Sequence, residues 1–592
     1  MLAMKSLLLW SLWIAEGLSI PAQVPMEAPP ADARRKLHGR FLHITDIHPD
    51  PHYIVDASQS SACHRRKPKK EKERSGYYGA PYRSGLCIAV LRASPICIHS
   101  DCDSPFRLTN LTLDFLDKNW ASEIDFVIWT GDNARHDNDR KLPRTLKEIY
   151  DLNHVIATKM EDVFLKKGVP VVPSLGNNDV WRPNDIISHF SSLWSAFVPF
   201  ASYQVFRRGA YYSVEVIPGQ VAVISLNTMF FYDSNKAVGG CEWPDREDPG
   251  NLQFDWLDVQ LDLFRSRGMK VYLTGHVPPS PGNYFEECYV RYVELSLRYQ
   301  DTILGHLYGH MNNDHFFLLE ADDLQFPSET DLDEKTSMAH DQLYETLIRD
   351  FADLPKNSKS TEYDDFGVVN VAPSVVPNPY LPSFRIFSYN VTNAEKIQDE
   401  ANLTKKKDKK KKKKGSKEPK RKHGHRHGNS SRETLCKQHE YEDSWRCKLW
   451  EPWNSDADAP SRRNTLWTPL GYAQYYLPEE RVMNKTRRPK FKLEYLTYRL
   501  DALHPAKAEM DSFAVDGFAY PVPVRQLPRS LRAGNATKSR YAPYGLGDLT
   551  IPSWLGLARK LGDASRGKLR RRFREYMYMG AGTAGPGVSE EI

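Results

Sequence analysis

Five short apolar runs in the sequence each lead into polar residues of the kinds that bind metal ions. The runs are FLHIT, FVIWT, VVPSL, VYLT and ILGHLY. The candidate ligands that follow them are Asp46, His48, Asp132, Asn177, His276, His310 and Asn312. Carboxylate and amide oxygens combined with imidazole nitrogens suit divalent Mn, Mg, Fe, Co or Zn, whereas a thiolate site would need cysteines. The spacing therefore predicts a divalent-metal centre.

The elements that must position these side chains follow from the apolar pattern. Strands are expected at 41–45, 126–130, 169–174, 211–216, 221–226, 270–274, 303–308 and 366–371. Helical spacing of apolar residues appears between them at 108–120, 143–166 and 252–267. Such alternation predicts an α/β layered domain. Because open α/β folds bind ligands at the carboxyl ends of their strands, the candidate ligands are expected to meet at one edge.

The order of the motifs resembles that of a known superfamily. From the N-terminus they are D-x-H, G-D-x-x, G-N-x-D, G-H and G-H-x-N. This order resembles the calcineurin-like metallophosphoesterases over about residues 40–390. The strings HITDIHPDPHY, GDNARHD, SLGNND, TGHVPPS and GHMNNDHF, with GYYG and DCDSPF, resemble the fungal vacuolar endopolyphosphatases within it. The resemblance implies an α/β four-layer sandwich, two packed mixed β-sheets flanked by helices, with an irregular C-terminal extension.

The resemblance also implies two divalent metal ions and a role for each candidate. Asp46 and His48 would hold the first ion, and Asp132 would bridge both. The second ion would be held by Asn177, His276 and His310. Two metals bridged by a carboxylate activate a water for attack on a phosphoryl group. The implied activity is that of an endopolyphosphatase, which hydrolyses internal phosphoanhydride bonds of inorganic polyphosphate.

Two positions depart from the superfamily pattern. Asn178 stands where G-N-H-D/E supplies a catalytic histidine, and its amide cannot transfer a proton. Asn312 stands where G-H-x-H supplies the last histidine ligand, and its carbonyl is a weaker ligand. Asparagine at both positions is what the resemblance to the endopolyphosphatase branch implies. His136, four residues beyond Asp132, then becomes the catalytic candidate that protonates the leaving oxygen or stabilises the transition state; alternatively it orients Asp132.

Composition divides the 592-residue chain into four segments. Residues 1–20 hold Lys5 and a short apolar run, which predicts a signal peptide or a retained signal-anchor. The catalytic domain is expected over 37–394 and a disordered lysine-rich insert over 395–435, because the insert cannot bury enough apolar surface to order itself. Residues 436–592 are aromatic and proline-rich, and are expected to pack onto the domain.

A secretory route agrees with two further features. N-x-S/T glycosylation acceptors occur at Asn110, Asn390, Asn402, Asn429, Asn484 and Asn535. The 8 cysteines form no C-x-x-C pattern, which favours disulfides. Plausible pairs are Cys63–Cys102, Cys87–Cys97, Cys241–Cys288 and Cys436–Cys447, although residues 80–100 are longer and more apolar than the resemblance predicts. Through the resemblance we expect the vacuole lumen, with membrane attachment if residues 1–20 are retained.

The charge balance bears on the partner. Basic residues exceed acidic ones by 81 − 75 = +6, and they cluster in runs at 65–74, 405–422 and 566–574. Such runs attract a polyanion such as polyphosphate through space. No motif indicates a specific nucleic acid, and the sequence leaves the oligomeric state open. With 34 glycines and 40 prolines, the chain is neither collagen-like nor wholly of low complexity.

Two alternatives to an endopolyphosphatase remain. An acid-sphingomyelinase-like phosphodiesterase shares the metal motifs and a secretory address, but that branch is expected to retain G-N-H-E and G-H-T-H and to carry a saposin-like domain upstream. Residues 21–40 are too short for that domain. A non-catalytic polyanion-binding protein with a degraded metal site is the other alternative, and the intact candidate ligands argue against it.

Overall fold

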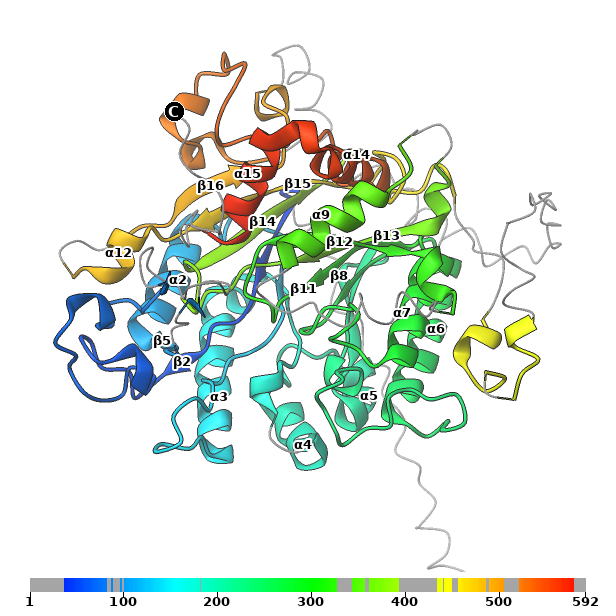
Figure 1. Ribbon diagram of the computed structural model, residues 1–592, viewed down its shortest axis with the longest axis horizontal. Helices are drawn as coiled ribbons and strands as arrows, with labels where there is room; N and C mark the ends of the chain where they lie inside the picture. Colours follow the sequence, from blue (N-terminus) through cyan, green and yellow to red (C-terminus); the bar gives the residue numbers. More distant parts are fainter. Residues whose placement is uncertain are drawn as a thin grey trace, which may run out of the picture. The chain divides into compact units, whose positions relative to one another are not determined.

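A computed structural model (Figure 1) describes residues 37–81, 87–88, 96–97, 101–180, 183–326, 343–356, 361–392, 434–439, 441–449, 456–485, 489–504 and 521–579. Residues 1–20 and the lysine-rich run lie outside these ranges, so the signal segment and the insert stay predictions, as do the domain boundaries. No helix of the described part is long and apolar enough to cross a bilayer.

The first of two six-stranded sheets contains the strand that begins the domain. Its order is β16-β15-β14-β1-β6-β7. The strands are β1 (Arg40–Ile44), β6 (Phe126–Trp129), β7 (Val171–Pro173), β14 (Ser383–Tyr389), β15 (Pro469–Tyr476) and β16 (Lys492–Leu496). β1, β6 and β7 are parallel, whereas β14, β15 and β16 continue the sheet antiparallel. The carboxyl ends of β1, β6 and β7 therefore meet at one edge.

The second sheet has the order β12-β13-β11-β10-β9-β8. Its strands are β8 (Tyr212–Ile217), β9 (Val221–Ser225), β10 (Lys270–Thr274), β11 (Ile303–Tyr308), β12 (His315–Glu320) and β13 (Phe366–Val371). β9, β10, β11 and β13 are parallel, and β8 and β12 are antiparallel to their neighbours. All eight strands expected from the apolar pattern are present within a residue or two.

The sheets pack face to face through aromatic side chains. The ring of Phe41 on β1 stacks at 4.7 Å on Phe126 and at 4.9 Å on Phe387 in its own sheet. It also lies 5.0 Å from the ring of Tyr272 on β10. All four rings are buried. Because large buried aromatic surfaces dominate core energetics, this contact helps to fix the spacing of the two sheets; it lies at the amino ends of β1 and β6, opposite the strand ends that carry the site.

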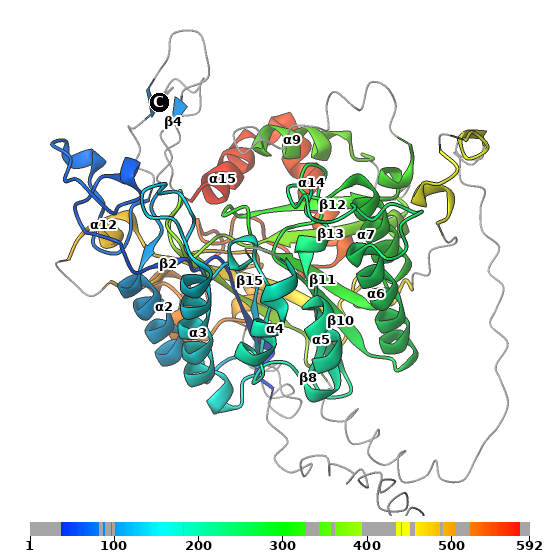
Figure 2. The ribbon, with the colours of Figure 1, turned by 90° about the horizontal axis from the view of Figure 1, so that it is seen from below.

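Helices cover the outer face of each sheet (Figures 1 and 2). Their bounds are α2 (Phe106–Asn119), α3 (Leu146–Val163), α4 (Pro183–Leu193), α5 (Tyr203–Gly209), α6 (Pro249–Ser266), α7 (Glu286–Arg298), α9 (Leu343–Asp353), α14 (Ile551–Gly562) and α15 (Gly567–Met577). Phe115 of α2 lies 6.1 Å, ring to ring, from Phe384 of the first sheet. On the second sheet, Tyr292 of α7 hydrogen-bonds the hydroxyl of Tyr308 at 2.7 Å. The four-layer α/β sandwich is thus confirmed.

The C-terminal segment contains regular elements that its composition did not predict. β15 and β16 extend the first sheet, and α14 and α15 follow them. Asp314, in the loop after β11, accepts hydrogen bonds from Gln474 Nε2 at 2.9 Å and Tyr495 Oη at 2.5 Å, and it pairs with Arg385. These partners belong to β15, β16 and β14, so the extension is bonded directly to a loop of the candidate site.

Three of the four expected disulfides are confirmed: Cys63–Cys102, Cys241–Cys288 and Cys436–Cys447. Cys87 and Cys97 are register partners in a two-stranded ladder. Their side chains lie outside the described part, so that pairing stays a prediction.

Replacing Arg385 by methionine is expected to destabilise the protein strongly. The Arg385 side chain is fully buried, and its loss leaves the Asp314 carboxylate without its cation. Removing one partner of a buried ion pair costs about 3–5 kcal/mol. The guanidinium midpoint of unfolding reports this loss. Arg463→Gln is the control, because both side chains of the Arg463–Asp458 pair are more than 70% exposed; equal midpoints for the two variants would contradict the assignment.

Candidate metal centre

The candidate ligands come from the loops that follow β1, β6, β7, β10 and β11. Five of these loop residues have positive φ: Asp46 (52°), His48 (41°), Asp132 (59°), His310 (70°) and Asn312 (58°). L-residues rarely adopt this left-handed region, and they keep it only where their surroundings enforce it. Five of the candidate ligands thus have a strained backbone, as is common at functional sites.

Backbone hydrogen bonds hold two of the loops together. The Asp46 N–H donates to the Gly131 carbonyl at 3.0 Å, and the His48 N–H donates to the Asp132 carbonyl at 3.2 Å. Gly176 lets the loop after β7 come close to Asp132, because a Cβ at this position would lie 2.0 Å from Asp132 Oδ1. The glycine of G-N-N-D is thus required by the Asp132 carboxylate.

The Asp132 carboxylate lies at the centre of the cluster. Its Oδ2 is 3.4 Å from His48 Nε2 and 3.1 Å from His276 Nε2. His48 Nε2 is also 3.5 Å from Asp46 Oδ1. The ligand atoms of Asp46, Asp132 and His276 lie within 4.8 Å of one another, and all three side chains are buried. This is the place expected for a carboxylate that bridges two ions.

Asn177 links the remaining two histidines. Its Oδ1 lies 3.0 Å from His276 Nε2 and 2.9 Å from His310 Nδ1. The His310 N–H donates to Asp46 Oδ2 at 3.1 Å, which connects this half of the cluster to the other. All six side chains expected to hold the two ions are thus brought together; their ligation stays a prediction.

The donor set fits divalent cations. His48 Nδ1 donates to the Ala134 carbonyl and His276 Nδ1 to the Thr130 carbonyl, each at 2.7 Å. A carbonyl only accepts, so the proton of each neutral ring is on Nδ1 and the Nε2 lone pair faces Asp132. His48 Nε2 has no hydrogen-bond partner among the described residues. Electron pairs that face one another in a buried site are stabilised by a cation between them.

The charges of the cluster shift the pKa values of its histidines. Burial lowers the pKa of His48, but Asp132 and Asp46 outweigh it and raise that pKa to about 10. Burial also lowers the pKa of His276, but the charges of Asp132 and Asp46 outweigh it and raise that pKa to about 9. The pKa of Asp132 is well below its ordinary value, since the histidines outweigh its burial. Without metal, the cluster therefore holds protons on these imidazoles.

Asn312 and Asn178 have different surroundings. The Asn312 amide donates from Nδ2 to the Asn378 carbonyl at 2.9 Å. Its buried Oδ1 has no hydrogen-bond partner within the described ranges, which fits the weak ligand expected from the sequence. Asn178 instead donates its backbone N–H to Asp132 Oδ1 at 2.8 Å and its Nδ2 to Oδ2 at 2.9 Å. Asn178 thus grips both oxygens of Asp132, and a catalytic role for it stays a prediction.

Sequence reasoning missed two residues that support these contacts. The Asp179 carboxylate accepts backbone N–H groups from Asp132 at 2.9 Å and from Gly176 at 3.0 Å. Its place in G-N-N-D could have indicated this role. Arg144 Nη1 donates to the Asn178 backbone carbonyl at 2.7 Å and to its Oδ1 at 3.2 Å, which orients the amide. No pattern in the sequence singled out Arg144.

Asp103 is a third missed residue, in the string DCDSPF. Its Oδ1 accepts from His136 Nδ1 at 2.6 Å, and its Oδ2 accepts from the His136 N–H at 2.7 Å. The His136 ring stacks on His48 at 4.2 Å and is 26% exposed. Ligand atoms of His48, Asp103 and His136 also lie within 4.8 Å of one another, so His136 could belong to a coordination shell instead. The structure places His136 at the open side of the cluster.

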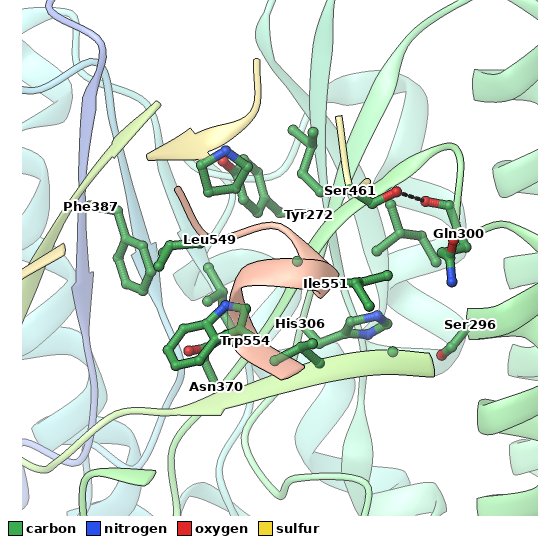
Figure 3. Close-up of a pocket in the computed structure, with 17 residues that line it drawn as sticks. Tyr272, Ser296, Gln300, His306, Asn370, Phe387, Ser461, Leu549, Ile551 and Trp554 are labelled. Atoms are coloured by element: carbon green, nitrogen blue, oxygen red, sulfur yellow. Dashed lines mark hydrogen bonds between the residues drawn. The ribbon is translucent and has the colours of Figure 1, made fainter. Parts of the chain in front are cut away.

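An internal cavity of about 40 Å³ lies elsewhere, against α14 (Figure 3). His306 lines it and hydrogen-bonds the Tyr292 hydroxyl at 2.7 Å. Burial lowers the pKa of His306 to about 3, so this ring is neutral. Tyr272 Oη and Asn370 Oδ1, which also belong to lining residues, have no partner in the described part, and the space suffices for ordered water. His306 is a structural residue.

Comparisons with known proteins place relatives beside this chain. The pattern of the calcineurin-like phosphoesterase family matches residues 39–313. An endopolyphosphatase of Cryptococcus neoformans var. neoformans serotype D is 38% identical over 643 residues, covering 93% of this chain and 92% of the relative. One from Saccharomyces cerevisiae is 36% identical over 439 residues, covering 61% and 62%. Among solved structures, a dimetal phosphatase from Danio rerio has 12% identity and a TM-score of 0.29, covering 59% of this chain and 92% of that chain.

Two packed mixed sheets, with a carboxylate–imidazole cluster at the ends of five strands, define a calcineurin-like phosphoesterase. Such a site is built for divalent metal ions, whose identity the donor set leaves open among Mn, Mg, Co, Zn and Fe. Within this class, the chain belongs to the endopolyphosphatase family.

Asp132→Asn is expected to lose bound metal and activity together. The substitution removes the negative charge from the middle of the cluster and keeps the shape of the side chain. Metal content by mass spectrometry should fall below that of the wild type. Asp137→Asn, in the same loop, is the matched control and should keep its metal. An Asp132→Asn protein with full metal content and normal turnover would contradict the central role of this carboxylate.

Metal binding is expected to release protons. At pH 7 the metal-free His48 and His276 are protonated, because their pKa values are about 10 and about 9. A metal binds only the neutral ring, so binding should release roughly two protons at that pH, and the apparent affinity should rise from pH 5 towards pH 9. Calorimetry in buffers of different ionisation enthalpy measures this number. An affinity independent of pH would contradict the protonated state.

Proposed function

We propose that the protein is an endopolyphosphatase that hydrolyses internal phosphoanhydride bonds of inorganic polyphosphate into shorter chains. The observation that carries the proposal is the Asp132-centred cluster in a chain of the endopolyphosphatase family. Bound divalent ions would supply a water of lowered pKa and neutralise charge on the phosphoryl oxygens. Asp46, His48, Asp132, Asn177, His276 and His310 would hold them.

The residues of this chain do the positioning. Asn178 and the loop anchored on Asp179 hold the Asp132 carboxylate in one orientation, so that it would need no rearrangement to bind metal ions. His43 and Thr130 lie beneath the cluster, where the His43 Nε2 and Thr130 Oγ1 atoms are 3.1 Å apart and buried. Such support reduces the motion that a metal site must lose on binding substrate.

His136 is the group proposed to move the proton. Its Nδ1 proton is donated to Asp103, which leaves Nε2 as the ring atom that can give a proton to the leaving phosphate oxygen. Burial raises the pKa of Asp103, but His136 and His48 outweigh it, so the pKa lies below its ordinary value and the carboxylate stays charged. The charged Asp103 carboxylate therefore fixes the orientation of the His136 ring.

Polyphosphate is favoured over the alternatives. Asn178 and Asn312 depart from the histidines expected of a sphingomyelinase-like phosphodiesterase, and the family membership points to endopolyphosphatases. A non-catalytic binding protein would have no need of six gathered ligands and a backbone strained around them.

We infer a vacuolar, lumenal location reached through the secretory pathway, with residues 1–20 as a signal or a type II membrane anchor. The disulfides support an oxidising compartment. Asn110, Asn484 and Asn535 are exposed and remain candidate glycosylation sites, whereas Asn390 is partly buried and donates to Asn464 Oδ1 at 2.8 Å. Asn402 and Asn429 lie outside the described residues.

The function is tested by incubating the metal-loaded protein with long-chain polyphosphate and resolving the products on a gel. Internal cleavage yields intermediate lengths early in the reaction, whereas release of single phosphates from the ends does not. Sphingomyelin serves as the competing substrate. Cleavage of sphingomyelin without cleavage of polyphosphate would refute the proposal in favour of the phosphodiesterase.

His136→Ala is expected to lower turnover by about 10²–10⁴-fold, the usual contribution of a proton-transfer residue, and to keep the metal. Asp103→Asn should lower turnover less and change its pH profile, since it removes only the support of the ring. His154→Ala, on the exposed side of α3, is the control. Lost metal in His136→Ala would place His136 in the coordination shell, and full activity would show that it has no role in proton transfer.

A further inference from the structure

A second cavity, of about 520 Å³, lies among β15, β16 and α15, outside the metal centre. The three elements lie side by side (Figure 1), and the Tyr495 ring of β16 stacks on Tyr576 of α15 at 4.5 Å. Its polar lining includes Lys492, Arg540, Arg572, Tyr476, Tyr541 and Tyr576. The three cationic groups are donors that phosphoryl oxygens accept from. Two of the phenols hold Arg540 in place: its Nη2 donates to Tyr541 Oη at 2.9 Å, and the Tyr576 hydroxyl donates to its carbonyl at 2.8 Å.

The acidic groups of this cavity do not cancel its charge. Glu575 pairs with Arg572 at 2.9 Å, but both side chains are more than a third exposed, so the pair is weak and can be exchanged for another anion. Burial raises the pKa of Glu494 to about 8, which makes this carboxyl neutral below that pH. Lys492 lies 3.9 Å from Glu480, in an exposed pair. The lining is therefore cationic at neutral and acidic pH.

Helix α15 extends the cationic surface beyond the cavity. Its sequence GKLRRRFREYM buries Phe573, Tyr576 and Met577 on one side, and exposes Lys568 and Arg571 on the other. Arg574 lies 3.8 Å from Glu345, and both of these side chains are more than a third exposed. A ridge of positive charge thus runs along the helix that borders the cavity.

The cavity adjoins the loops of the metal centre. Leu381 lines it and is three residues from Asn378, whose carbonyl accepts from Asn312. Three residues span at most about 11 Å. At the end of α15, the Met577 carbonyl accepts from the Asp314 N–H at 3.3 Å, and Met579 lines the cavity. Two segments therefore connect the cavity to the loop that carries His310 and Asn312.

We propose that this cavity and the basic side of α15 form a second binding site for condensed phosphate, which holds one part of a polyphosphate chain while an internal bond lies at the metal centre. The proposal rests on the proposed function. It gives that function a physical basis for preferring long chains, because a substrate of a few phosphates cannot reach both sites. The attraction is electrostatic and is screened by salt.

The test is a triple variant, Lys492→Gln/Arg540→Gln/Arg572→Gln, assayed on tripolyphosphate and on polyphosphate longer than a hundred units. For the long substrate we expect KM to rise about tenfold or more at low salt, because three charge-assisted contacts are lost. For tripolyphosphate, kcat/KM should change less than about twofold, since none of the three residues lies in the catalytic cluster. The salt dependence of KM for long chains should become shallower.

A matched control carries the same change of charge elsewhere. Lys166→Gln/Arg267→Gln/Arg463→Gln replaces exposed residues outside the cavity, and it should leave KM for both substrates near that of the wild type. Unchanged melting temperatures confirm that both proteins are folded. If the first variant affects both substrates equally, or no more than the control does, the second site is refuted. If the wild type cleaves neither polyphosphate, the proposed function itself is wrong.

Discussion

The structure depends on holding the Asp132 carboxylate buried and charged in one orientation. Two N–H donors of Asn178 bond its two oxygens, and the Asp179 carboxylate holds the backbone of its loop. A buried carboxylate is stable only if it is hydrogen-bonded and paired with positive charge. Here the positive charge comes from imidazolium protons in the metal-free protein, and divalent ions can replace those protons. The same arrangement therefore stabilises the fold and creates the metal centre.

The orientation of Asp132 explains the role of the asparagine at position 178. A histidine in place of Asn178 could transfer a proton. Its ring has no amide, however, that donates to Asp132 from nitrogen and accepts from Arg144 at oxygen. The proton-transfer role that we propose belongs instead to His136, which Asp103 holds against the His48 ring. Loss of the usual histidine therefore does not imply loss of chemistry.

The C-terminal segment completes the catalytic domain. Its strands β15 and β16 contribute Gln474 and Tyr495, which together with Arg385 surround Asp314 two residues after Asn312. Its helix α15 borders both this loop and the basic cavity. The same contacts thus pack the extension and position the loop of the site. This explains why a segment remote in sequence belongs to the same folded unit.

The sequence by itself determined the strands and indicated the candidate ligand residues that the fold brings together, because apolar runs and the polar residues directly after them are local features. It also indicated three disulfide pairs and the α/β class. It could not show that Asp103 holds His136 or that Arg144 orients Asn178, since these contacts join residues about 33 positions apart and bring together side chains with no motif of their own. The strands of the extension were missed for the same reason: Tyr, Gln and Glu in β15 and β16 are buried by pairing with β14 and by the Asp314 network, so only the tertiary structure decided that they form a sheet.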